Sequence, residues 1–179
     1  MVAPKKERLL FGVFVLVLIV IIELTLHHFH LPAWPAIMVM IFFFVTHMDK
    51  SVIPHMILGG LVGIVGYMLA APFVQATAGL MGAETARLVY ICLFVFIIIV
   101  FGEMLPVLLN AYGFMFMLVG SIAAGVEGAE PDPWLWMAVE LVGGSLIILG
   151  ILGIGRLMVI LNMPMHQAPV ATGSGDHFE

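Results

Sequence analysis

Long apolar runs decide what this chain can fold into. From Leu9 to Leu26 the only ionisable side chain is Glu23, and the run extends over about 20 residues, the length that crosses the hydrocarbon core of a bilayer as a helix. Similar runs recur along the chain, so that 63% of its 179 residues are hydrophobic and only 9% are charged. Soluble domains carry far more charge. The sequence therefore predicts an all-α integral membrane protein.

Proline, glycine, histidine and charged residues divide the apolar sequence into six predicted transmembrane helices. The fourth and fifth are separated at Glu103 and Pro106, because proline lacks a backbone N–H and its ring disrupts a helix. We expect one membrane domain over residues 1–162 and a mobile cytoplasmic tail over 163–179 that contains Pro, Gly and Ser. The predicted spans are 9–28, 33–48, 52–73, 87–105, 107–125 and 134–160.

Basic residues predict the orientation, since loops on the cytoplasmic side of a membrane are enriched in Lys and Arg. An even number of spans places both termini on one side. Arg87 then faces outward, whereas the other basic residues share the side of the termini. We therefore expect a protein of the bacterial inner membrane with cytoplasmic termini. The basic residues on that side are Lys5, Lys6, Arg8, Lys50 and Arg156.

The two halves of the chain resemble each other. The segments LPAW and LNAY each open a helix, and MILGG and ELVGG lie in the helices that follow. One interpretation is a pair of inverted three-helix repeats, by which many transporters build a central site. The alternative is a chance likeness of glycine-rich apolar helices. In both cases small residues let helices approach closely, and the candidates for this packing role are Gly59, Gly60, Gly63, Gly143 and Gly144.

Ionisable residues in the spans are candidates for chemistry, because an acid costs a few kcal/mol to insert into a membrane. Glu23, His27 and His30 share one face of the first helix by their spacing. We expect Glu23 to face the interior of the bundle or a wet cavity, where a carboxyl beside imidazoles can relay protons or bind a cation. Alternatively, the histidines are interfacial anchors and Glu23 is hydrogen-bonded between helices. Glu103 and Glu140 are candidates for a proton or solute path. Alternatively, Glu103 marks a cytoplasmic turn and Glu140 lies at the level of the external headgroups.

Other residue types bear on further functions. Trp34 and Tyr112 either belong to an aromatic belt or line a cavity as gate residues. Methionines and histidines within 47–56 and 163–166 suit cuprous copper, but no thioether array repeats along one face, so copper handling ranks third and no bound metal or cofactor is expected. The chain has no Walker loop, HExxH or nucleophile elbow and no basic cluster for nucleic acid. We expect neither an enzyme nor a nucleic-acid-binding protein.

The order of several segments resembles the membrane part of the fusaric acid resistance and aromatic acid exporter family, over most of residues 9–160. The segments are LPAWPAIMVM, DKS, ILGGLVGIVGYML, LLNAYGFMFMLVG, PDPWLW and AVELVGGSLIILGI. Small six-helix bacterial inner-membrane proteins share this pattern. The resemblance implies a six-helix module for proton-driven efflux of small aromatic or other carboxylic acids, working as a homo-oligomer or beside a partner membrane protein. The leading hypothesis is thus a transporter or channel module, and the alternative is a non-transporting assembly subunit of a larger membrane complex.

Overall fold

The structure is a bundle of apolar helices. The computed structural model describes residues 6–126 and 132–161, and within these ranges it contains helices and turns but no strand. Four helices have the length and composition to cross a membrane, as expected of a multi-pass membrane protein. The elements are α1 (Lys6–His28), α2 (Trp34–Val45), η1 (Lys50–Val52), α3 (Ile53–Met81), α4 (Ala83–Phe101), α5 (Ala111–Val126), α6 (Pro133–Ala138), η2 (Val139–Gly144) and α7 (Ser145–Ile160).

The predicted spans differ from these helices in two ways. The second and fifth spans correspond to α2 and α5, which have 12 and 16 residues and are shorter than the roughly 20 residues that cross a bilayer. The third span was predicted to end at residue 73, but α3 continues past Pro72 to Met81. Proline is tolerated within helices in a membrane, and α3 ends instead at Gly82, whose φ of +81° suits glycine. The predicted tail 163–179 lies outside the described residues.

Polar residues begin several of the helices. The Asp132 carboxylate accepts hydrogen bonds from the backbone N–H groups of Trp134 and Leu135 at the start of α6. The Asn110 amide oxygen accepts from the N–H of Tyr112 and Gly113 at the start of α5. Both arrangements satisfy N–H groups that have no partner inside the helix. The predicted break between the fourth and fifth spans is present, because residues 102–110 form turns.

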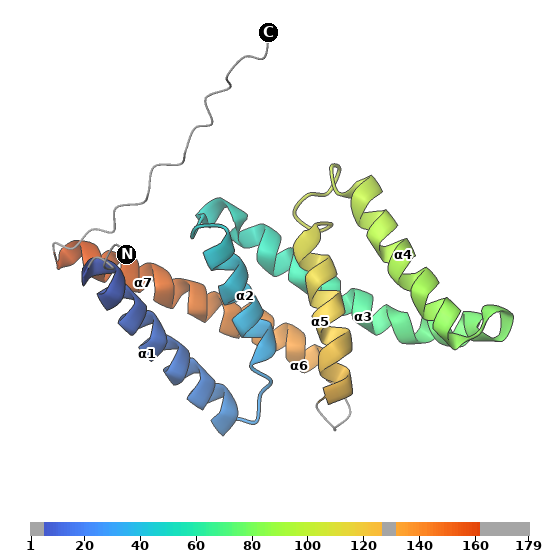
Figure 1. Cartoon of the computed structure of the whole chain (residues 1–179), viewed down its shortest axis with the longest axis horizontal. Coiled ribbons are helices and arrows are strands. Elements are labelled where there is room, and N and C mark those ends of the chain that lie inside the picture. The colour runs from blue at the N-terminus through green and yellow to red at the C-terminus, as the bar shows by residue number, and fades with distance from the viewer. Residues whose placement is uncertain (1–5, 127–131, 162–179) are drawn as a thin grey trace, which may run out of the picture.

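Two long helices organise the bundle, and each holds the shorter helices of the other half of the chain (Figure 1). The first is α3, and α4 and α5 pack along it. The second is the continuous helix formed by α6, η2 and α7, on which α1 and α2 pack. The two long helices meet where α6 and η2 contact α3. The last helix has a π-helical turn, η2, at this junction.

The core lies where α2, α3, α5 and the last helix meet. Its largest fully buried side chains include Phe43, Met56, Phe116 and Trp136, each from a different one of these helices. The outer helices α1 and α4 bury few residues and present long apolar side chains on their surfaces. Such a surface is unfavourable in water and suits a hydrocarbon solvent.

Candidate functional site

A buried carboxyl group lies at the junction of the two long helices. Glu140 belongs to the π-helical turn η2 and is 0% exposed, and neither of its carboxyl oxygens has a hydrogen-bond partner in the described residues. Opposite it, Gly60 of α3 leaves room for the carboxyl group. A Cβ atom at Gly60 would collide with Oε1 of Glu140 and would lie 2.9 Å from Cδ2 of Phe116. Glu140 thus occupies a notch formed by α3 and α5.

The local helix geometry and sequence explain this placement. A π-helical turn widens the helix by one residue per turn, and such turns occur frequently at functional sites. Gly143 and Gly144 follow Glu140, and a Cβ at Gly144 would lie 2.9 Å from Cγ2 of Val39. Glycine therefore brings the α2 backbone close on one side of η2, while Gly60 admits the Glu140 side chain on the other. Burying a carboxyl group without a hydrogen-bond partner costs free energy in an apolar interior, so the position of Glu140 lowers the stability of the fold.

A second polar group lies beside the notch. The Asn110 amide nitrogen donates hydrogen bonds to the carbonyl oxygens of His55, Pro106 and Val107 at 3.0, 3.1 and 3.1 Å. The Asn110 side chain fills the space that a Cβ at Gly59 would need. Asn110 and Glu140 therefore pack on consecutive glycines of α3. The buried Nδ1 atom of His55 has no hydrogen-bond partner in the part of the chain that the structure describes.

Aromatic rings continue from the notch through the bundle. Phe116, which contacts the Gly60 notch, has its ring centroid 6.0 Å from that of Trp34, and Trp34 is 5.2 Å from Trp136. Trp136 lies one helical turn before Glu140 and is 5.2 Å from Tyr67. We call these four residues, together with Phe42 and Tyr112, the aromatic cluster, because Phe42 joins Phe116 at 6.0 Å to Tyr112 at 4.9 Å. The buried indole N–H of Trp34 has no acceptor among the described residues.

The site residues predicted from the sequence fall into three groups. Glu23, His27 and His30 are exposed on or just after α1, and Glu103 is exposed in the turn after α4. In the single chain, Glu23 therefore lies at the surface of the bundle and not in its interior. Glu140 is buried, and the predicted gate residues Trp34 and Tyr112 are both in the aromatic cluster. The predicted packing glycines all lie at helix contacts: Gly59, Gly60, Gly63, Gly143 and Gly144.

Sequence reasoning did not identify the residues that lie at or near the Glu140 notch. Asn110 carried a signal, because an Asn before an apolar run is typical of a helix start. Phe116 carried none, because an aromatic residue in an apolar helix is usually a packing residue. His55 lies within the segment 47–56 that was considered for copper. No group of three or more His, Cys, Asp or Glu residues that could hold a metal occurs in residues 6–126 and 132–161.

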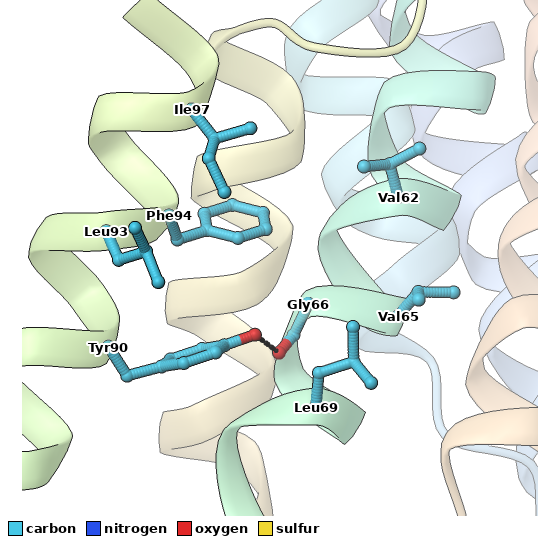
Figure 2. Close-up of a pocket in the computed structure, with 8 residues that line it drawn as sticks. All are labelled: Val62, Val65, Gly66, Leu69, Tyr90, Leu93, Phe94 and Ile97. Atoms are coloured by element: carbon cyan, nitrogen blue, oxygen red, sulfur yellow. Dashed lines mark hydrogen bonds between the residues drawn. The ribbon is translucent and has the colours of Figure 1, made fainter. Parts of the chain in front are cut away.

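A separate cavity of about 220 Å³ lies between α3 and α4 (Figure 2). The hydroxyl group of Tyr90 on α4 donates a hydrogen bond to the carbonyl oxygen of Gly66 on α3. The cavity contains no ionisable group besides this tyrosine, so it offers no polar chemistry of its own. Its lining residues are Val62, Val65, Gly66, Leu69, Tyr90, Leu93, Phe94 and Ile97.

Comparisons of the chain with protein-family models, with curated proteins and with solved structures found no match. The candidate site is therefore interpreted from its own geometry.

Proposed function

We propose that this protein is a transporter of small solutes across a membrane, in which Glu140 binds and releases the coupling proton. The observation that carries the proposal is a fully buried carboxyl group at the junction of two membrane-length helices, with no hydrogen-bond partner among the described residues. Ionisable residues inside a membrane mark proton relays and ion or substrate paths. Purely structural carboxyl groups in proteins are paired or hydrogen-bonded, and Glu140 is neither in the described residues.

The arrangement of helices supports an alternating mechanism. Helices α1 and α2 pack on α7 and η2, and α4 and α5 pack in the same manner on α3. We interpret α1–α3 and α4–α7 as two inverted three-helix repeats whose first two helices are exchanged. In this interpretation Gly60 and Gly144 are equivalent positions, as the likeness of MILGG to ELVGG indicates. Transporters with inverted repeats bind their substrate at the repeat interface, which here is the junction that contains Glu140.

This interpretation implies six crossings of the membrane, with α2 and α5 as short crossing helices. The basic residues then place both termini in the cytoplasm, and we assign the protein to the bacterial inner membrane on that basis. We also propose a homo-oligomer. Glu23 and His27 are exposed on α1, and a carboxyl group in contact with lipid is unfavourable. A second copy of the chain would cover this face.

The test is proton-coupled flux in proteoliposomes that contain the full-length protein and an internal pH indicator. A pH gradient is imposed, and proton movement is measured while either benzoate or benzyltrimethylammonium is supplied on one side. We expect one of these solutes to accelerate proton movement in the wild type. Glu140→Gln should abolish the acceleration, because its amide has nearly the shape of the protonated acid but cannot release a proton. Glu84→Gln is the matched control, since Glu84 is an exposed acid at the start of α4.

Two outcomes would contradict the proposal. Equal acceleration in the wild type and in Glu140→Gln would remove Glu140 from the mechanism. If the acceleration is lost in Glu23→Gln but kept in Glu140→Gln, the proton site lies on α1. If neither solute accelerates proton movement and the protein purifies in mild detergent only with other membrane proteins, the assembly-subunit hypothesis is favoured instead.

A further inference from the structure

The charge around Glu140 restricts what can bind there. Among the elements that pack on η2, neither α2 nor α6 carries a titratable side chain, and α3 carries His55 and Tyr67. On α5, Tyr112 is the only titratable residue. The only Lys or Arg on any of these helices is Arg156 of α7, which is exposed and lies about 24 Å farther along the helix at 1.5 Å per residue. An anion at the Glu140 notch would therefore meet a carboxyl group and no fixed positive charge.

The walls of the site favour an organic cation. Within residues 6–126 and 132–161 the Glu140 oxygens have no hydrogen-bond donor, so an ionised carboxylate needs positive charge from an incoming ligand. Phe116 of α5 lies at the notch. Trp136 is on the same helix as Glu140, one turn before it, and the rings of Trp34 and Tyr67 pack against Trp136. Aromatic faces attract ammonium groups. Magnesium ions prefer several oxygen ligands, whereas Glu140 is the only buried carboxyl group in the part of the chain that the structure describes.

We infer that the Glu140 site takes a small organic cation of the ammonium class in exchange for a proton. This inference rests on the proposed function and names its substrate class. The protonated carboxyl group releases its proton to water as the cation arrives, and the resulting carboxylate forms an ion pair with the cation. The net charge of the site is the same before and after. Phe116, at the Gly60 notch, is the aromatic residue closest to this ion pair, and it joins the notch to the aromatic cluster through Trp34.

The exchange is tested by binding to the full-length protein in detergent micelles. The probe is benzyltrimethylammonium chloride, which is permanently charged and cannot itself carry a proton. Benzoate, benzyl alcohol and sodium chloride are matched controls, since the first two share the ring but are anionic and neutral. Affinity and proton release are measured by calorimetry in buffers of different ionisation enthalpy. We expect proton release and an affinity that rises by up to about tenfold per pH unit across the titration of Glu140.

Variants separate this inference from the proposed function. Glu140→Gln should bind the probe without proton release and without pH dependence, and Glu140→Asp should keep proton release because it keeps the carboxyl group. Infrared difference spectra of the protein without ligand report whether the Glu140 carboxyl exchanges its proton at all. If that carboxyl band, identified by its loss in Glu140→Gln, does not respond to pH, the proposed function fails.

If the band responds but benzoate binds instead of benzyltrimethylammonium, only the inference on substrate class fails. Loss of that benzoate binding in His55→Gln would then identify His55 as the positive charge that the anion uses. Equal binding of benzyl alcohol, or proton release by sodium chloride alone, would also overturn the inference. Proton release by benzyltrimethylammonium in wild type and in Glu140→Asp, with none in Glu140→Gln, supports it.

Discussion

The close contact between α3 and α5 gives a prediction that can be worked from the structure. Gly63 and Gly113 face each other with no side chain between the two backbones. A Cβ atom at Gly63 would lie 2.8 Å from Cβ of Phe116 and 2.9 Å from the carbonyl carbon of Gly113, and it would collide with the carbonyl oxygen of Gly113. Two of the three obstructing atoms belong to backbone, so no side-chain rotation can relieve the overlap.

The magnitude follows from the required shift. Carbon atoms pack best at about 3.5–4.0 Å, so the helices in Gly63→Ala must separate locally by at least about 0.6 Å, and neighbouring contacts are lost. Overpacking of this kind costs about 1–3 kcal/mol. The greater helix propensity of alanine offsets up to about 1 kcal/mol of this cost. We expect Gly63→Ala to lower the free energy of unfolding by about 0–2 kcal/mol, and to be about 1–3 kcal/mol less stable than a variant with the propensity gain alone.

The control is Gly153→Ala in α7, because nothing lies within 4 Å of a Cβ at that position. There, the helix-propensity gain should act alone and leave stability unchanged or raised by up to about 1 kcal/mol. Both variants are compared with the wild type by reversible unfolding in mixed detergent micelles, with helical content and tryptophan fluorescence as independent signals. If Gly63→Ala proves as stable as Gly153→Ala, the two backbones are not in the contact described, and the reasoning about glycine notches fails.

Three further predictions use the same unfolding assay. Tyr90→Phe should lose about 0.5–1.5 kcal/mol of stability, because it loses only the hydroxyl that bonds the α3 backbone; no loss would mean that this bond is exchanged for an equivalent one. Asn110→Ala should lose about 1–3 kcal/mol of stability, since it removes the side chain that links α3 to the start of α5. Asn110→Asp keeps the acceptor oxygen for the α5 N–H groups and should lose less stability. The opposite order would contradict this account. Hydrogen bonds from the backbone and side chain of Ser51 lower the pKa of Asp49, so Asp49 stabilises the fold above pH about 4. This contribution is lost as the pH falls through the folded-state pKa. The acid side of the pH–stability profile should flatten in Asp49→Ala, and a profile identical to that of the wild type would contradict this account.

Apolar length and helix-breaking residues were sufficient to predict most of the helices. The first and last predicted spans, 9–28 and 134–160, agree closely with Lys6–His28 and Pro133–Ile160. The helix of the third span runs beyond residue 73 to Met81, because proline is tolerated within helices in a membrane. The π-helical turn at Val139–Gly144 could not be predicted, since it depends on how η2 packs between α2 and α3.

The candidate site shows a different limit. Helical spacing correctly indicates that Glu23 and His27 share a face, but spacing does not tell whether that face turns toward other helices. Glu140 was considered close to the external headgroups because it follows Asp132 by about two turns. Its burial depends on Gly60, which is distant in sequence and whose missing side chain provides the space. The paired glycines at 59–60 and 143–144 were visible in the sequence, but their partners became known only from the packing of the helices.

The exchange of partners between the two halves has a consequence for biosynthesis. Helices α1 and α2 emerge first, yet they pack on η2 and α7, which are the last of the described helices to be made. Until then, α1 and α2 remain in the bilayer without their main neighbours in the chain. Assembly of this bundle is therefore governed by contacts between distant parts of the sequence, which form slowly. A protein that shields nascent membrane helices should matter more for this chain than for a bundle whose successive helices pack in order.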